Sequence, residues 1–234
     1  MLRTYIKEKQ KKLMSQQVDF YTPSGIHVYF KDQLENQNID IEDVISTVES
    51  KVPHHLLSEI EMIVVGWFEE FEDRDINAFY KDAILHISNL QDDASDMIDD
   101  IIHEVAHAAE EVYGFDIYSD SKIKNEFLQK RERLYNELWA LGYKAPKSFF
   151  AEIEFNNEFD DFLLNTVGYD KLSVICSGLF INAYAPTSLR EYFATGFTDF
   201  YMRSDDRETL KLVSPSLYKK ILDLNLKENL DNVY

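Results

Sequence analysis

Two histidines in the middle of the chain have the spacing of metal ligands. His103 and His107 stand four residues apart, and Glu104 directly follows the first of them. On a helix such residues share one face with Cβ atoms about 5–6 Å apart, and two imidazoles so placed can bind one Zn²⁺ at about 2.0–2.1 Å. A carboxylate about 100° further round the helix can accept the proton of a zinc-bound water. The segment HEVAH therefore predicts two ligands of a Zn²⁺ cofactor and, in Glu104, a general base.

The surrounding residues predict the helix that would carry this motif. Between residues 94 and 113 one side of the helix is apolar, and the other carries the histidines with several acidic residues. Gly114 then stands where a left-handed cap is favoured, so we expect the helix to end there. The alternative is a solvated acidic face that carries two histidines by chance. The apolar back of the helix favours the metal site.

A catalytic zinc site needs a third protein ligand and an open position for water. A third histidine in the pattern H-E-x-x-H-x-x-G-x-x-H is excluded, because the chain has Glu110 and Tyr113 at the Gly and His positions. Asp116 and Asp120 follow the motif closely but lack the Gly-Thr context of aspartate-ligand enzymes. Glu191, in SLREYFATGFTDF, is the remaining candidate. On the residues alone, it is equally well explained as a carboxylate favoured by the dipole at a helix N-terminus.

The segment EYFATGF downstream of HEVAH resembles the catalytic domain of the anthrax lethal factor-like metallopeptidases, a group of gluzincins. The resemblance covers about residues 40–203. It implies a zincin-like fold in which Glu191 is the third zinc ligand. It also implies that Tyr184, seven residues before Glu191, stabilises the transition state.

One position departs from the family pattern. Four residues after the ligand the family has an acidic residue that often orients a zinc-binding histidine, whereas this chain has Thr195. Groups of this kind change metal affinity or activity by about 10–100-fold. Four carboxylates could replace the missing one, namely those of Asp99, Asp100, Glu110 and Asp199.

The motif and the resemblance together imply a zinc-dependent endopeptidase in which Glu104 activates the water and Tyr184 stabilises the oxyanion. The expected partner is a protein or peptide substrate. We expect strand 83–88 to lie at the edge of the sheet beside the histidine helix, where an extended peptide could pair with it. A negative surface would favour a basic substrate segment.

The order of predicted elements indicates an α+β fold, with a small N-terminal sheet packed on a mainly helical C-terminal part. The predicted strands are 26–30, 60–68 and 83–88, and within 78–90 a strand and a turn are predicted before strand 83–88. The predicted helices are 2–17, 39–52, 94–113, 121–141, 148–166, 169–182, 188–203 and 214–231. We divide the chain into an N-terminal helical arm (1–24), a zincin-like metallopeptidase domain (25–204) and a C-terminal helical extension of that domain (205–234).

Charge and composition narrow the possible partners. The formal net charge is −19, with 24 Lys and Arg against 43 Asp and Glu, so nucleic-acid phosphates and anionic lipid would be repelled. The chain shows neither a secretory h-region nor an apolar stretch of membrane-spanning length, which makes a cytoplasmic location the default expectation. The single cysteine, Cys176, lies in an apolar run and is expected to be a buried filler.

Two other readings of the sequence stay open. A non-catalytic or weakly active descendant of a metallopeptidase would keep the fold, with or without the metal, as a structural or binding protein in a larger assembly. Thr195 and the basic segment 1–13 are consistent with it. An acidic mimic of nucleic acid would explain the charge but would not explain the histidine motif.

Overall fold

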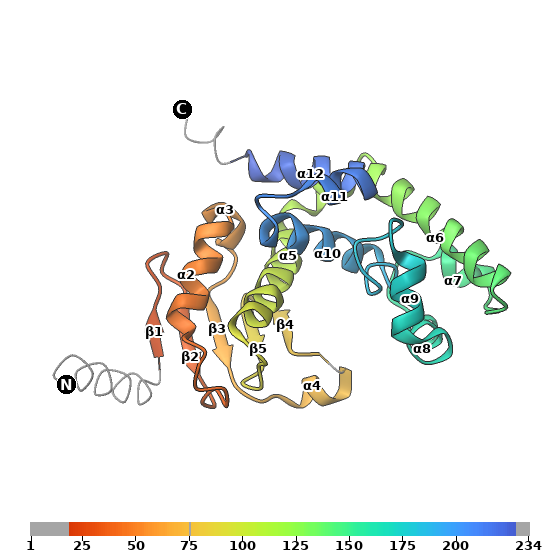
Figure 1. The fold of residues 1–234 in the computed structure, drawn as a ribbon. Coiled ribbons are helices and arrows are strands. Elements are labelled where there is room, and N and C mark those ends of the chain that lie inside the picture. The colour runs from red at the N-terminus through yellow and green to blue at the C-terminus, as the bar shows by residue number, and fades with distance from the viewer. Residues whose placement is uncertain (1–18, 75, 228–234) are drawn as a thin grey trace. The chain divides into compact units, whose positions relative to one another are not determined.

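The computed structural model describes residues 19–74 and 76–227 (Figure 1), and it confirms an α+β chain. The predicted helix 2–17 lies outside the described residues. The chain divides into two compact units, one up to Ala108 and one from Ala109 onward. The division falls inside the long helix α5 (Ala94–Tyr118), so each unit contains part of this helix.

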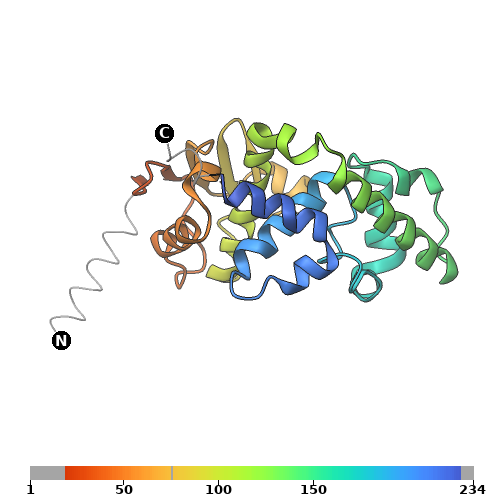
Figure 2. The same ribbon diagram turned by 90° about the horizontal axis from the view of Figure 1, so that it is seen from above.

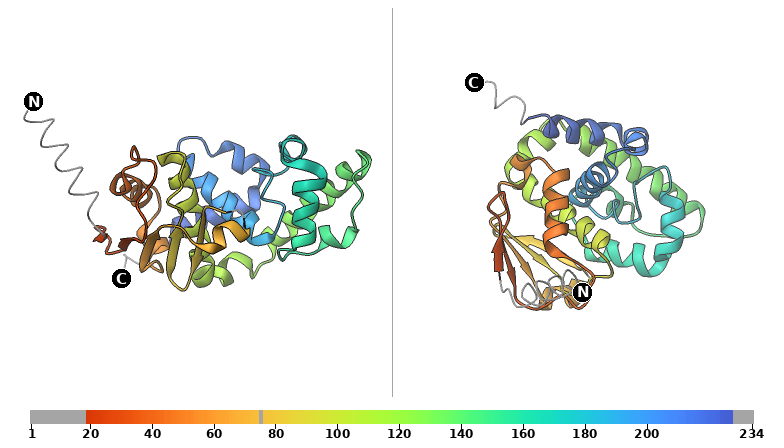
Figure 3. Two further views of the ribbon diagram at one scale, coloured as in Figure 1. Left: turned by 90° about the horizontal axis from the view of Figure 1, so that it is seen from below. Right: turned by 60° about the vertical axis from the view of Figure 1, so that its left-hand side comes forward.

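The first unit is built on a five-stranded mixed sheet in the order β1-β2-β3-β5-β4. The three inner strands are parallel, and β1 and β4 pair antiparallel at the two edges. The strands are β1 (Asp19–Tyr21), β2 (His27–Phe30), β3 (Met62–Val65), β4 (Ala78–Lys81) and β5 (Ile84–Ile87). One side of the inner strands is fully buried, and the right-hand view of Figure 3 shows helix α2 (Ile41–Lys51) and the start of α5 on one face of the sheet.

The strand predicted over residues 83–88 is present as β5, but its predicted position at the sheet edge is wrong. β5 pairs with β3 on one side and with β4 on the other, so β4 is the edge strand. The reason is the two-residue turn at Asp82 and Ala83, which have φ angles of 52° and 63°. Two successive positive φ angles turn the chain back tightly and place β4 outside β5. Neither residue is a glycine or asparagine, so the sequence carries a weak signal for this turn.

Shorter helices complete the first unit. Helix α2 begins after Asp40, whose side chain accepts a hydrogen bond from the backbone N–H of Glu42. Helix α3 (His54–Leu57) follows Pro53, and helix α4 (Glu69–Arg74) precedes the hairpin. The predicted strand 60–68 is confined to β3, because the chain after Val65 turns toward α4.

Helix α5 is longer than predicted. It begins after Asp93, whose carboxylate accepts hydrogen bonds from the N–H groups of Ser95 and Asp96, and it runs through Gly114 to Tyr118. A glycine inside a helix costs about 1 kcal/mol relative to alanine. The fully buried Ile117 on the last turn can offset this cost, since burying such a side chain is worth about 1.5–3 kcal/mol.

The second unit is helical. After the end of α5 it contains α6 (Lys122–Ala140), α7 (Lys147–Ala151), α8 (Asn157–Asp161), the π-helical segment η1 (Phe162–Gly168), α9 (Tyr169–Cys176), α10 (Leu189–Met202), α11 (Glu208–Val213) and α12 (Pro215–Asn225). The helix predicted over 148–166 is broken, because α7 ends at Ala151 and Asn156 caps α8. The helix predicted over 169–182 ends at Cys176, which is buried as expected. In the described part of the chain, no helix has both the length and the apolarity to span a membrane.

Helix α10 forms the centre of the second unit. Every residue from Tyr192 to Tyr201 is buried, and α10 lies beside α12 (Figure 2). The two helices approach closely at Gly196, where a Cβ atom would lie 2.3 Å from Leu217 Cδ2. The carboxylate of Glu126 on α6 adds a polar link, accepting hydrogen bonds from the Tyr192 hydroxyl at 2.9 Å and from the N–H of Ser216 at 2.8 Å.

Candidate metal centre

Helix α5 presents its two histidines one turn apart. The ring centroids of His103 and His107 are 5.2 Å apart, with their planes at 78°, and both side chains are half-buried. This geometry follows from the helix itself, since side chains at i and i+4 meet on one face. On the opposite side the same helix buries residues including Ile101 and Val105, as expected, although Val112 is exposed.

Glu191 stands in the first turn of α10. The Ser188 side chain caps this helix and accepts a hydrogen bond from the Glu191 N–H at 3.1 Å. Phe193, Ala194, Phe197 and Phe200 on this helix are all buried. Glu191 is only half-buried, so its carboxylate belongs to the small part of α10 that the core does not enclose.

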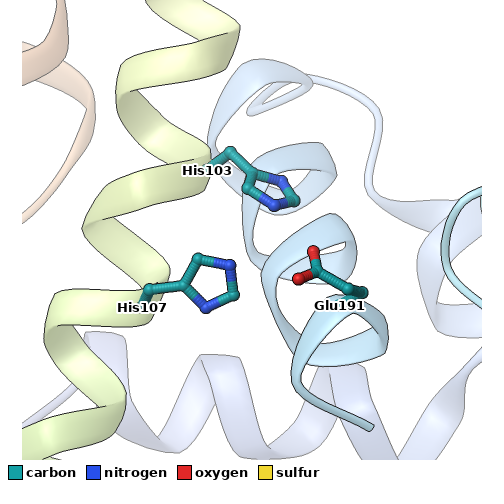
Figure 4. A group of neighbouring side chains, drawn as sticks. All are labelled: His103, His107 and Glu191. Carbon is teal, nitrogen blue, oxygen red and sulfur yellow. The ribbon is translucent and has the colours of Figure 1, made fainter. Parts of the chain in front are cut away.

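The two imidazoles and the Glu191 carboxylate form one candidate metal-binding group. One ligand atom from each residue lies within 4.8 Å of the other two, and Figure 4 shows the side chains directed toward one another. Two imidazoles and one carboxylate are a donor set found in catalytic zinc sites. In a tetrahedral site with bonds near 2.1 Å, ligand atoms lie about 3.4 Å apart. The donor set therefore fits Zn²⁺.

Glu104 is held by the edge strand. Its side chain is buried, with 8% exposed, and its Oε2 atom accepts a hydrogen bond from the backbone N–H of Tyr80 on β4 at 2.7 Å. A buried carboxylate is costly unless it is hydrogen-bonded, and this bond reduces that cost. An ionised carboxylate offers about four lone-pair sites, so capacity to accept a proton remains.

Thr195 does not replace the family's acidic residue. Its hydroxyl is buried, and among the described residues no group hydrogen-bonds to it. Each of three candidate carboxylates has a different partner: Asp100 accepts from the Gln91 amide at 3.2 Å, Asp199 pairs with Arg203, and Glu110 pairs with Arg190. Burial raises the pKa of Asp100 to about 6, although the bond from Gln91 works in the other direction.

Tyr184 lies in the loop before α10, with 36% of its surface exposed. The Asn182 side chain accepts hydrogen bonds from the N–H groups of Tyr184 and Ala185, and the carbonyl of Tyr184 accepts from the N–H of Thr187. These bonds fix the loop backbone. The role of the Tyr184 hydroxyl as an oxyanion donor stays a prediction.

Sequence reasoning missed three residues that hold the candidate site. Tyr80 acts through its backbone N–H, which no side-chain pattern reveals. Arg190 and Tyr118 both donate hydrogen bonds to Glu110. A charged residue directly before Glu191 was a visible signal for Arg190, whereas Tyr118 was overlooked because the helix was expected to end before it.

Comparison of the chain with family models, with curated proteins and with solved structures finds no match. The resemblance to the lethal factor-like metallopeptidases therefore remains a prediction that depends on the residues quoted for it.

Proposed function

We propose that the protein is a zinc-dependent endopeptidase. The observation that supports this proposal best is the grouping of His103, His107 and Glu191, with ligand atoms within 4.8 Å, on the helix that also carries the buried Glu104. In this proposal the first three residues hold Zn²⁺ and Glu104 is the general base. A solvated acidic face would not require a carboxylate from a second helix to point at the histidines.

When bound, Zn²⁺ would lower the pKa of a coordinated water toward 7 and polarise a peptide carbonyl. Glu104 accepts the proton of the attacking water and passes it to the nitrogen of the leaving amine. The bond from the Tyr80 N–H keeps one carboxylate oxygen of Glu104 oriented during both transfers. By the resemblance, the Tyr184 hydroxyl donates a hydrogen bond to the developing oxyanion.

The edge strand β4 suggests where an extended substrate would bind. The N–H of Tyr80 points toward Glu104 rather than toward β5. In an antiparallel pair alternate residues face outward, so Ala78 also directs its backbone groups to the open edge. Because Glu104 accepts the N–H of Tyr80, a peptide would pair with this edge at Ala78, near the general base, and main-chain bonds would give affinity with little dependence on its sequence.

The variant Glu104→Gln tests the proposal, because glutamine keeps the size of the side chain and its ability to accept the Tyr80 bond but cannot take a proton. We expect it to retain stoichiometric zinc and to lose cleavage of casein or a peptide library by about 10²–10⁴-fold. Zinc content is measured by elemental analysis, and the activity of the wild type should be abolished by a chelator. Activity near that of the wild type in this variant would contradict the mechanism.

A second candidate is a metal-binding protein without peptidase activity. Thr195 favours it, because no described residue hydrogen-bonds to its buried hydroxyl and the position that orients a ligand in the resembling family lacks a carboxylate here. Stoichiometric zinc without any cleavage by the wild type would support this candidate. Absence of both zinc and cleavage would instead support the acidic nucleic-acid mimic.

A further inference from the structure

An ion pair between a buried carboxylate and a largely exposed arginine joins the two helices that carry the proposed ligands. Glu110 lies on α5, three residues after His107, and only 6% of its side chain is exposed. Its Oε2 atom accepts a hydrogen bond from Arg190 Nε at 3.2 Å. Arg190 lies on α10 and directly precedes Glu191. The pair therefore links the turn of α5 that follows His107 to Arg190, the residue directly before Glu191.

Tyr118 provides a second link between the same helices. Its hydroxyl donates a hydrogen bond to Glu110, and its ring lies 6.3 Å from the ring of Phe193, centroid to centroid, at 66°. Because Tyr118 stands two turns after Glu110 on α5, it reaches back along the helix toward its N-terminus. Glu110 thus has one partner on its own helix and one on α10.

We propose that Glu110 and Arg190 are positioning residues that hold Glu191 toward the imidazoles of His103 and His107. This inference rests on the proposed function. The Glu110–Arg190 pair would supply the orienting function that a carboxylate at position 195 supplies in the resembling family. It would act through the backbone of α10 and not through a hydrogen bond to a metal ligand. The first turn of α10, which carries Arg190 and Glu191, is the least enclosed part of that helix. The hydrogen bond from Arg190 to Glu110 on α5 can therefore limit the movement of this turn.

The sign of the effect on metal affinity separates positioning from electrostatics. Removing the positive charge of Arg190 near a cation site would by electrostatics alone strengthen metal binding. Removing a group that positions Glu191 would weaken it. Measurement at high salt, where the Debye length falls to about 3 Å at 1 M, suppresses the electrostatic effect further.

The variant Arg190→Ala tests the proposal through zinc affinity, measured by competition with a chromophoric chelator. We expect affinity to fall by about 10–100-fold. The absorption spectrum of the Co²⁺-loaded protein should also change, since a looser carboxylate alters the coordination, and Arg190→Lys should restore part of the affinity.

The variant Arg203→Ala is a matched control. Arg203 also pairs through Nε with a buried carboxylate at 3.2 Å, that of Asp199, and the two arginine side chains are similarly exposed, at 64% and 58%. The Arg203–Asp199 pair is an i,i+4 contact at the C-terminal end of α10, away from Glu191 in the first turn. We expect zinc affinity in this variant to equal that of the wild type. If Arg190→Ala proves unstable, Arg190→Met gives a second test, since it keeps much of the apolar side chain, removes the same charge and the bond to Glu110, and should also weaken zinc binding.

Zinc affinity in Arg190→Ala equal to that of the wild type would overturn the positioning role and leave the peptidase proposal intact. An equal loss in Arg190→Ala and Arg203→Ala would also overturn it, because the effect would then be general to α10. Zinc binding without cleavage by the wild type would overturn the peptidase proposal. The positioning role would then still be tested by the zinc affinity of Arg190→Ala.

Discussion

Helix α5 is buried almost all round only in its middle, from Ile101 to Glu110, where His103 and His107 are half-buried, whereas helix α10 is buried along nearly its whole length. On α5 the relation of His103 to His107 is set by the period of the helix, which depends on neighbouring residues only. On α10 the direction of Glu191 depends on how the whole helix is packed. The difference indicates that half of the candidate site is local in origin and half depends on contacts between distant segments.

The interior glycines of the two helices give the sharpest test of this comparison. For Gly196→Ala on α10 we expect a loss of about 3 kcal/mol in the free energy of unfolding, the upper end of the range for overpacking a core. The added Cβ would lie 2.3 Å from the fully buried Leu217 side chain, which has little room to move. Urea denaturation of the metal-free protein measures this loss.

Gly114→Ala on α5 is the matched control. At Gly114 a Cβ would meet no atom within 4 Å, and the helix continues through this residue. We expect a gain of about 0.5–1 kcal/mol, because alanine favours a helix more than glycine does. Similar losses in both variants would contradict the contrast drawn between α5 and α10.

The buried carboxyl of Asp100 on α5 predicts that the free energy of unfolding depends on pH. The pKa of Asp100 is raised to about 6, chiefly by burial, so this carboxyl stabilises the fold below its unfolded pKa and the contribution is lost as the pH rises through 6. Asp100→Asn should therefore increase the free energy of unfolding at pH 7 by about 2 kcal/mol and flatten its decline between pH 4 and 6. Urea titrations of the metal-free protein across this range provide the measurement.

Asp96→Asn is the control for that prediction. Asp96 is exposed in the first turn of the same helix, where a carboxylate interacts favourably with the helix dipole. We expect a small loss of stability, about 0.3–1 kcal/mol, rather than a gain. A gain in both variants would mean that general repulsion among acidic groups, rather than the burial of Asp100, is responsible.

The smallest effect is expected at Thr195 on α10. Valine has nearly the same shape and removes a buried hydroxyl that no described residue satisfies. Leaving such a group unpaired costs about 1–3 kcal/mol, so Thr195→Val should raise the melting temperature of the metal-free protein, by an amount equivalent to about 1 kcal/mol. A lowered melting temperature would show that the hydroxyl has a stabilising partner.

Much of the fold was predictable where the signal is local. The alternating residues of β2 and the periodic faces of α2, α6 and α10 identified these elements close to their observed bounds, whereas β3 is much shorter than the predicted strand 60–68. The strand, turn and strand predicted within residues 78–90 are confirmed as β4 and β5, but prediction failed for the place of β5 in the sheet, which is not at the edge, and for the end of α5. In the second case a favourable capping residue was outweighed by burial of Ile117, which depends on residues far along the chain.

The sequence by itself determined the chemistry that is available: two imidazoles at helical spacing, a carboxylate beside them, and a further glutamate on an apolar helix. Spacing along one helix is a local property, so it can be read without coordinates. Only the tertiary structure decided that β4 forms the sheet edge that holds Glu104 and that Arg190 pairs with Glu110. Those relations join residues 24 and 80 positions apart, and they arise from packing and hydrogen bonding that no local pattern encodes.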